Sequence, residues 1–429
     1  MRELQMKTKA VRLHGTKDLR LEEFELPAIR EDEILAHIVS DSICMSSYKA
    51  ASQGTAHKRI PKDVADHPII IGHEFCGELV EVGARWRTQF QPGQKFSIQP
   101  ALNYPQGPVG VLGAPGYSYR YIGGDATYIV IPQEVMQQGC LLPYQGDAYF
   151  KGSLAEPMSC IVGAFHASYH TSPGSYEHRM GIVPGGAMAL LAGVGPMGLG
   201  AIDYALHCDR RPARLVVTDI DEARLARAAS IYGVEEARRQ GVTLAYVNTK
   251  GMAKPESELL AVNGGKGYDD VFVFAPVAPV IELGDKLLAY DGCLNFFAGP
   301  TDPFFSARLN FYNVHYGAAH LVGTSGGNTA DMIESLELMG EGRIDPATMV
   351  THVGGLDAVV ETTLHLPEIP GGKKLMYTNV SLPLTAIADF AEKGKTDPFF
   401  AELARRTAQN KGLWSKEAEE YLLAHAARL

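Results

Sequence analysis

The chain has 429 residues, 46% of them hydrophobic, so it can bury more than one core and we expect two domains. Its net charge of −10 at pH 7 argues against nucleic acid or an anionic membrane surface as a partner. Six cysteines are scattered without a Cys-x-x-Cys pair, and residues 1–9 contain charges and no apolar signal core. We therefore expect reduced thiols and a cytoplasmic protein.

The first 160 or so residues are rich in glycine, proline and short β-like runs. Strands are predicted near residues 34–39, 78–83, 92–96 and 127–132. The pattern favours an irregular β-barrel domain.

Soft and hard metal ligands are spread along this first part of the chain. Cys44 follows the strand at 34–39, His73 and Glu74 precede the strand at 78–83, and Glu156 comes later. Thiolate, imidazole and carboxylate are ligands of zinc, and a catalytic zinc site keeps a fourth position open. Two ligand charges leave such a site near neutral and able to polarise an oxygen. Glu74 would be a fourth ligand or an outer carboxylate.

From about residue 166 to 326, predicted strands alternate with helices, which is typical of a doubly wound α/β sheet. The apolar run 187–192 leads into a Gly-x-Gly-x-x-Gly turn that lets the backbone approach a pyrophosphate at a helix N-terminus. This turn supplies the predicted cofactor-binding residues Gly193, Gly195, Pro196, Met197 and Gly198.

Asp219 stands about 20 residues beyond this turn, after the predicted strand at 214–218, where a ribose-binding acid is expected. A carboxylate there accepts hydrogen bonds from a free 2′-hydroxyl, so NAD(H) is favoured over NADP(H). Arg224 could weaken that preference. The alternative is a helix-capping role for Asp219, although Asp221 could also provide that cap.

Residues 180–202 carry no charge and are numerous enough to span a bilayer. Glycines and prolines interrupt them, so we interpret the run as a buried strand followed by the inner face of a helix. Later strands are predicted near 270–274, 292–297 and 311–316; the last contains Asn313 and His315. Two helices are predicted in the tail from about residue 382, one capped by Asp397 before Pro398 and one by Ser415.

Three segments together resemble the zinc-containing medium-chain alcohol and polyol dehydrogenases. Residues 42–46 resemble the family's first ligand segment, 71–77 its Gly-His-Glu segment, and 154–158 its Glu-Pro segment. The resemblance runs from about residue 9 to 370. It implies a GroES-like catalytic domain formed by 1–165 and 327–429, with a returning helix at 331–339, and a Rossmann dinucleotide-binding domain at 166–326.

The family's chemistry would then apply to these residues. Zinc on Cys44, His73 and Glu156 would polarise a carbonyl that receives hydride from the nicotinamide. In relatives a proton relay runs from a hydroxyl to a histidine; Ser46 keeps the hydroxyl, whereas Lys49 stands where the histidine would be. Lys49 would end the relay, hold an anionic substrate, or simply be solvated.

Two further expectations depend on the same resemblance. Many relatives bind a structural zinc through four clustered cysteines, but residues 92–128 contain no cysteine, so we expect one catalytic zinc per chain and no structural zinc. Edge strands such as the one predicted at 311–316 pair between subunits in the family, which implies a homodimer or homotetramer.

The substrate is predicted from the segment between Cys44 and His73, which lines the pocket mouth in the family. Its candidate substrate residues are Tyr48, Lys49, His57, Lys58 and Arg59. In an acidic protein this basic cluster indicates a phosphate or carboxylate on the substrate; an ordinary solvated loop is the alternative.

Whole-chain similarity points within the family to enzymes that interconvert L-sorbose 1-phosphate and D-glucitol 6-phosphate. The alternatives that stay open are a dehydrogenase of an unphosphorylated polyol or secondary alcohol, a zinc-free quinone-type reductase, and a non-catalytic nucleotide-binding scaffold.

Overall fold

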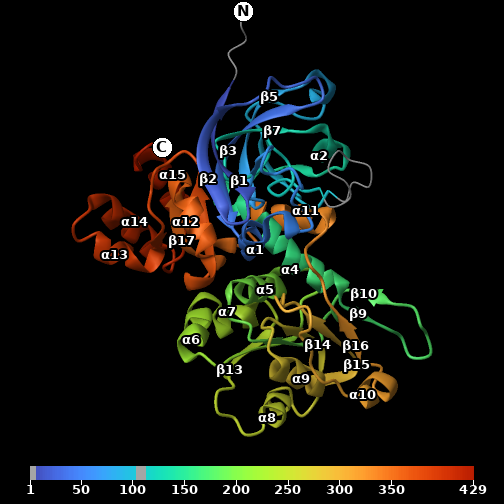
Figure 1. The fold of residues 1–429 in the computed structure, drawn as a ribbon. Helices are drawn as coiled ribbons and strands as arrows, with labels where there is room; N and C mark the ends of the chain where they lie inside the picture. The colour runs from blue at the N-terminus through green and yellow to red at the C-terminus, as the bar shows by residue number, and fades with distance from the viewer. Residues whose placement is uncertain (1–5, 103–112) are drawn as a thin grey trace, which may run out of the picture. The chain divides into compact units, whose positions relative to one another are not determined.

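The computed structural model describes residues 6–102 and 113–429 (Figure 1). Part of the cysteine-free segment 92–128 and of the N-terminal segment 1–9 lies outside these residues. One compact unit consists of Met1–Glu156, Leu336–Gly342 and Pro346–Leu429, and the other of Pro157–Ser335 and Arg343–Asp345. The domain bounds predicted at 165/166 and 326/327 stay a prediction. In the structure, the chain passes from one compact unit to the other inside helices α4 (Ala155–Ala167) and α11 (Thr329–Gly340).

The first unit is built on β-sheets, as its short apolar runs predicted. An eight-stranded sheet has the order β19-β17-β18-β3-β5-β6-β8, with β7 also paired to β3, and a three-stranded sheet has the order β2-β1-β4. The strands are β1 (Lys7–Gly15), β2 (Asp18–Glu25), β3 (Ile34–Ile43), β4 (Ile69–Ile70), β5 (Phe75–Val82), β6 (Lys95–Ile98), β7 (Tyr128–Ile131), β8 (Leu141–Pro143), β17 (Val350–Gly355), β18 (Lys373–Tyr377) and β19 (Thr385–Ala386).

Strand β3 lies at the centre of this unit and is buried on both faces. Ile34, Ala36 and Ile38 point into one hydrophobic cluster, whereas Leu35 packs with Val130 in another. This alternation follows from the two-residue period of a strand. The short helices of the unit are α1 (Met45–Gln53), α2 (Gln133–Gln137), α3 (Tyr149–Ser153) and α12 (Val359–Leu364).

The second unit contains a six-stranded parallel sheet with the order β13-β12-β11-β14-β15-β16, which confirms the predicted doubly wound fold. The strands of this sheet are β11 (Ala187–Leu191), β12 (Arg214–Asp219), β13 (Thr243–Asn248), β14 (Tyr268–Val273), β15 (Leu288–Phe296) and β16 (His320–Val322). Two further strands, β9 (Tyr169–His170) and β10 (Arg179–Met180), form a separate antiparallel pair. The helices of this unit include α5 (Pro196–His207), α6 (Glu222–Ile231), α7 (Val234–Arg239), α8 (Pro255–Val262), α9 (Ala278–Leu287) and α10 (Phe311–Tyr316).

The prediction of a strand at residues 311–316 is wrong, because this segment forms helix α10. The Asn310 side chain accepts a hydrogen bond from the backbone N–H of Tyr312 at 3.0 Å, and this cap favours a helix over an extended chain. Asn313 and His315 therefore lie on a helix. The edge strand of the sheet is β16, which begins four residues after α10 ends.

The uncharged run 180–202 includes β11 and the beginning of α5, as predicted. None of the helices in residues 6–102 and 113–429 combines the length and hydropathy needed to cross a membrane.

In the tail, Asp397 and Ser415 cap α14 (Pro398–Gln409) and α15 (Lys416–His425), as the sequence predicted. A shorter helix, α13 (Phe390–Lys393), precedes them.

Candidate functional site

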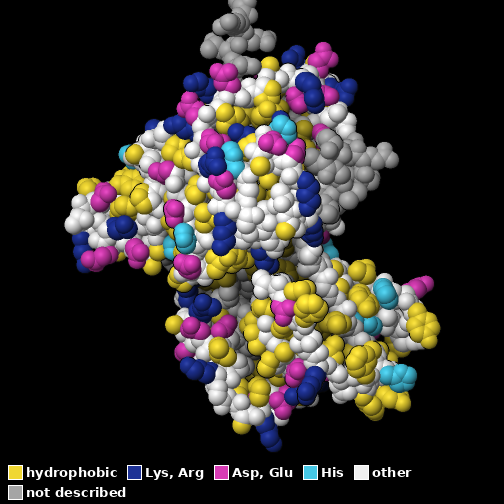
Figure 2. Space-filling model, viewed as in Figure 1, with side chains coloured by type: hydrophobic (Ala, Val, Ile, Leu, Met, Phe, Trp, Pro, Cys, Tyr) yellow, Lys and Arg dark blue, Asp and Glu magenta, His cyan; other side chains and the backbone are white. Residues whose placement is uncertain are grey.

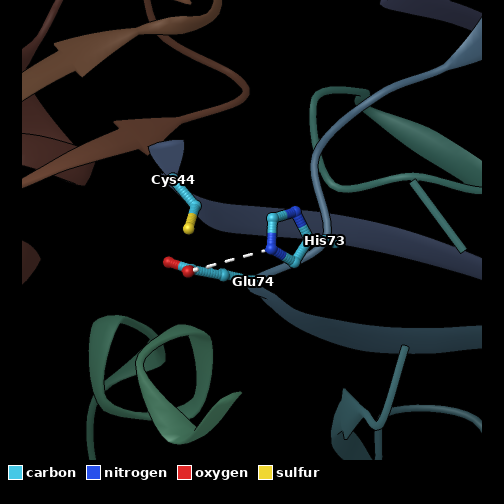
Figure 3. A group of neighbouring side chains, drawn as sticks. All are labelled: Cys44, His73 and Glu74. Atoms are coloured by element: carbon cyan, nitrogen blue, oxygen red, sulfur yellow. Dashed lines mark ion pairs between the residues drawn. The ribbon is translucent and has the colours of Figure 1, made fainter. Parts of the chain in front are cut away.

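Two antiparallel strands bring Cys44 and His73 together. β3 ends just before Cys44, β5 begins just after Glu74, and Asp41 pairs with Phe75 between the two strands. Residues just beyond one strand therefore meet residues just before the other. Figure 3 shows the side chains of Cys44, His73 and Glu74 facing one another. Their ligand atoms all lie within 4.8 Å of one another.

Hydroxyl groups orient the thiol and the imidazole. Cys44 Sγ lies 3.0 Å from Ser46 Oγ, and His73 Nδ1 lies 3.2 Å from Ser47 Oγ. Burial lowers the pKa of His73, which favours the neutral imidazole that binds metals. Burial raises the pKa of the Cys44 thiol, whereas the positive charge of Lys373 opposes that rise.

Lys373 is a site residue that the motif analysis missed. Its Nζ donates to both carboxylate oxygens of Glu74, at 2.5 and 2.7 Å. It reaches the site because β18 pairs with β3, with Lys374 opposite Ile43, the residue before Cys44. Burial lowers the pKa of Lys373, but the charges of Cys44 and Glu74 raise it more, so the ammonium stays charged. The only signal in the sequence was a pair of lysines at the start of an apolar strand.

Glu156 lies at the start of α4 and outside the group that falls within 4.8 Å. Burial and the neighbouring charge of Glu74 raise the pKa of Glu156 to about 7, and the charges of His73 and Cys44 also act on it. The fold therefore places Cys44, His73 and Glu74 in contact range, with the Glu156 carboxyl in the same electrostatic environment.

Two buried acids, Asp41 and Asp125, lie beside the backbone of the segment that carries His73 and Glu74. The N–H of Glu74 donates to Asp41 Oδ1 at 3.2 Å. Gly72 has φ = +92°, and a Cβ there would lie 2.6 Å from the backbone nitrogen of Asp125. Burial raises the pKa of Asp125 to about 7, and burial together with the charge of Asp125 raises the pKa of Asp41 well above its ordinary value. The spacing of the motifs did not reveal these acids.

Tyr117 was also missed, and it joins the ligand atoms to the basic loop. Its hydroxyl lies 3.1 Å from His73 Nε2, and burial raises its pKa well above the ordinary value, so it stays protonated. The ring stacks on His57 with centroids 5.9 Å apart, and Arg59 Cζ lies 5.9 Å from the same ring centroid. No local pattern marks this tyrosine.

The predicted substrate residues occupy different environments. Lys58 and Arg59 line a cavity of about 420 Å³, together with Arg120, Asp63 and His67 among others. His57 is not among the lining residues; its ring stacks on Tyr117, and burial lowers its pKa. Tyr48 and Lys49 lie on α1, where Tyr48 packs against a hydrophobic cluster.

The glycine turn connects β11 to α5 as predicted. Gly195 caps α5, and Pro196 and Met197 begin its first turn. A Cβ at Gly198 would lie 2.2 Å from the carbonyl oxygen of Gly193, so only glycine permits this close approach. A Cβ at Gly195 would meet no atom within 4 Å. The turn thus combines tight packing with open space before a helix N-terminus, where an anion is favoured.

Asp219 is the last residue of β12, the strand beside β11. Its Oδ1 accepts from the backbone N–H groups of Ile220 at 2.8 Å and Asp221 at 3.0 Å. The helix cap is Asp221, which accepts from the N–H of Arg224 at 3.1 Å. The Arg224 side chain also lies on Asp221, with Nε 3.9 Å from Oδ2.

Two family models match the chain. Residues 30–140 match the alcohol dehydrogenase GroES-like domain, and residues 196–341 match the zinc-binding dehydrogenase model.

Full-length relatives carry more specific names. The chain is 53% identical to L-sorbose 1-phosphate reductase of Klebsiella pneumoniae, over 98% of each chain. It is also 53% identical to mannitol-1-phosphate 5-dehydrogenase of Aliivibrio fischeri, over 97% of each chain. A solved zinc-binding dehydrogenase of Sinorhizobium meliloti 1021, bound to NADP, shares the fold with a TM-score of 0.67 at 19% identity, covering 87% of this chain and all of its own. Zinc and a nicotinamide cofactor are thus both represented among the proteins that this chain resembles.

Proposed function

Because the chain belongs to the zinc-binding dehydrogenases with an alcohol dehydrogenase GroES-like domain, and is an oxidoreductase, we propose that it reduces a phosphorylated ketose with NADH. L-sorbose 1-phosphate, reduced to D-glucitol 6-phosphate, is the proposed substrate. The observation that carries the proposal is the approach of the Cys44 and His73 ligand atoms, with a Glu74 oxygen, to within 4.8 Å of one another in a chain so similar to a sugar-phosphate reductase.

The charges of the site suit a dication. A Cys44 thiolate and the carboxylates of Glu74 and Glu156 bring three negative charges, and Lys373 contributes one positive charge. The remaining two negative charges would be neutralised by Zn²⁺. When bound, zinc acts as a Lewis acid on the carbonyl oxygen of the substrate. We propose one zinc per chain, held by Cys44, His73 and Glu156.

Glu74 is the proposed outer carboxylate. Lys373 donates to both of its oxygens, which opposes a direct bond from Glu74 to the metal. The Glu156→Gln variant should therefore purify with little zinc, whereas the Glu74→Gln variant should retain it, as measured by metal analysis per chain. Retention of zinc by the Glu156→Gln variant and its loss from the Glu74→Gln variant would exchange the two roles.

Ser46 and Tyr117 are the proposed proton-handling and positioning groups. Ser46 Oγ, beside the Cys44 sulfur, would donate a proton to the reduced substrate oxygen, and the protonated Tyr117 hydroxyl would orient that oxygen. Lys49 lies three residues after Ser46 on α1, hence on the same face of the helix, and would connect Ser46 to solvent.

NAD(H) is the proposed cofactor in preference to NADP(H). The nicotinamide supplies the hydride when the cofactor is bound at the turn from Gly193 to Gly198. The Asp219 carboxylate would accept from the ribose hydroxyls and repel a 2′-phosphate. Arg224 shares its charge with a second carboxylate, because its Nε lies 3.9 Å from Asp221 Oδ2.

The basic cavity supports a phosphate on the substrate. Lys58, Arg59 and Arg120 bring three cationic side chains to its lining, against the single carboxylate of Asp63. The Arg59 guanidinium and His73 both approach Tyr117, one at its ring and the other at its hydroxyl. Guanidinium groups bind phosphate through paired hydrogen bonds, so Arg59 and Arg120 are the proposed phosphate-binding pair.

Mannitol 1-phosphate is the second candidate substrate, because the relative that bears its name is equally identical to this chain. In D-fructose 6-phosphate, the corresponding ketose, the phosphate lies at the far end from the carbonyl. In L-sorbose 1-phosphate it lies on the adjacent carbon.

NADH oxidation should be measured against L-sorbose 1-phosphate beside L-sorbose, and D-fructose 6-phosphate beside D-fructose, with and without a zinc chelator. Strong, chelator-sensitive preference for one phosphate supports the proposal and identifies the ketose. Arg120→Met should remove that preference and leave the rate on the free sugar unchanged. Equal rates on free and phosphorylated sugars would make the protein a general polyol dehydrogenase.

A homodimer or homotetramer is also proposed. The second unit exposes large apolar side chains around its edge strand; among them Phe311 is 75% and Leu321 54% exposed. Figure 2 shows hydrophobic side chains gathered in the part of the view where Figure 1 places α10. An unpaired edge strand with such a border favours pairing with a second copy.

A further inference from the structure

We infer that the C-terminal tail positions the metal site through one buried carboxylate, Glu419. The inference rests on the proposed metal site and goes beyond it, because the tail lies outside both segments that match the family models. Glu419 is a positioning residue: it touches neither metal nor substrate, and acts through the elements that carry Glu156 and Lys373.

Glu419 lies on α15, is 2% exposed, and receives three hydrogen bonds. Oε2 accepts from the backbone N–H of Tyr149 at 2.6 Å. Oε1 accepts from the backbone N–H of Phe150 and from the Tyr377 hydroxyl, each at 2.8 Å. A carboxylate with this many donors is fixed in place, and it links three segments far apart in the sequence.

The first link leads to Glu156. Tyr149 and Phe150 form the first turn of α3, whose amide hydrogens have no partner within the helix. α3 ends at Ser153, which is itself bonded to Ser40 on β3. α4 begins only two residues later and presents Glu156 in its first turn. The place of α3 therefore determines where the Glu156 carboxyl lies.

The second link leads to Glu74. Tyr377 is the last residue of β18, and Lys373, the partner of Glu74, is the first. The Trp414 indole N–H donates to the Tyr377 hydroxyl at 2.8 Å, so a second tail residue supports the same contact. The tail thus positions both carboxylates of the metal site. It acts on Glu156 through α3, and on Glu74 through β18 and Lys373.

Glu419→Gln tests the inference, because the amide keeps the size of the side chain but cannot accept from both backbone amides and the tyrosine. Ser415→Ala is the matched control: it removes the cap of the same helix, the bond that the Ser415 hydroxyl accepts from the Ala418 N–H, and leaves all three donors of Glu419 in place. Zinc release to a colorimetric chelator and the melting temperature are measured for both variants and the wild type.

We expect the Glu419→Gln variant to release zinc about tenfold faster than the wild type. The Ser415→Ala variant should lose thermal stability yet release zinc at the wild-type rate. Equal release rates in the wild type and the Glu419→Gln variant would overturn the inference.

One outcome separates this inference from the proposed function. A wild-type protein that binds no zinc contradicts the proposed metal site itself, before any variant is compared. If Glu419→Gln does not fold, Tyr377→Phe removes one of the three bonds, and release unchanged in that variant would count against the link to β18.

Discussion

The ion pair between Lys373 and Glu74 is the residue-level feature that distinguishes this site from a bare set of metal ligands. A buried carboxylate is costly unless a partner compensates it, and here the partner is an ammonium at 2.5 Å. The pair keeps the Glu74 charge from acting alone on Cys44 and Glu156. Lys373 therefore compensates the Glu74 charge whether or not a metal is bound.

Lys373→Met should destabilise the zinc-free protein by about 3 kcal/mol, because it leaves Glu74 as a buried charge without its partner. Added zinc should recover part of this loss by supplying the missing positive charge. Urea unfolding with and without zinc measures both effects.

Lys374→Met is the control for this change. Lys374 is also buried on β18, but it donates to the carbonyls of Gly372 and Pro370, and burial lowers its pKa to about 8. Its loss should not depend on zinc. The same zinc response in both variants would contradict the role given to Lys373.

At the level of elements, the nucleotide turn separates two uses of glycine. At Gly198 the close contact with Gly193 leaves no room for a side chain, whereas at Gly195 the space before α5 is open. Gly198 is therefore needed for the fold, whereas Gly195 leaves room for a pyrophosphate to approach.

Gly198→Ala should therefore lower both the melting temperature and the affinity for NADH, the latter by about tenfold, or about 1.4 kcal/mol. Gly195→Ala should leave stability within about 0.5 kcal/mol and weaken NADH binding alone. Calorimetry and NADH fluorescence titration give the two readouts. Wild-type NADH affinity in the Gly195→Ala variant would show that the cofactor does not approach there.

The tail element should add a pH dependence to stability. Burial raises the pKa of Glu419 to about 7, from an ordinary value of 4.5, despite the hydrogen bonds that lower it. The folded state then binds a proton more tightly than the unfolded state. This stabilisation is complete below about pH 4.5 and is lost as the pH rises through about 7.

Relative to Glu419→Gln, the wild type should lose up to about 3 kcal/mol of unfolding free energy between pH 5 and pH 8. Urea midpoints of both proteins at the two pH values measure the difference. A constant difference would mean that the donors from α3 keep the carboxylate ionised throughout.

At the scale of the whole molecule, the second unit carries an apolar border around its edge strand β16, and α7 packs against β13 at the opposite edge of the sheet. The apolar border favours association at the β16 edge. Assembly and catalysis would then concern different surfaces of the chain.

Leu321→Glu should convert the proposed oligomer to monomers, because it places a charge on the edge strand β16. Val234→Glu on α7 is the control: Val234 is 46% exposed, near the 54% of Leu321, but lies at the other edge. Light scattering after size-exclusion chromatography measures the mass. A Leu321→Glu protein with the mass of the wild type would place the interface elsewhere.

The sequence by itself determined the features that depend on neighbours along the chain. Apolar runs predicted β3, β7, β11 and β12, the glycine pattern predicted the turn before α5, and Asp397 and Ser415 marked two helix starts. Strand periodicity, turn conformation and helix caps are all local interactions, so their signals lie within a few residues. The exception, residues 311–316, is short enough that one capping asparagine outweighed the alternation.

Only the tertiary structure decided which side chains from distant segments meet. Lys373 and Glu74 are 299 residues apart, Glu419 and Phe150 are 269 apart, and Tyr117 and His73 are 44 apart. Each of these contacts follows from the order of strands or the docking of the tail, which no local pattern encodes. The candidate ligands were visible in the sequence because they lie in local motifs. Lys373, Tyr117 and Glu419, which balance their charge or hold them in place, were not visible, because tertiary packing alone brings these residues to the site.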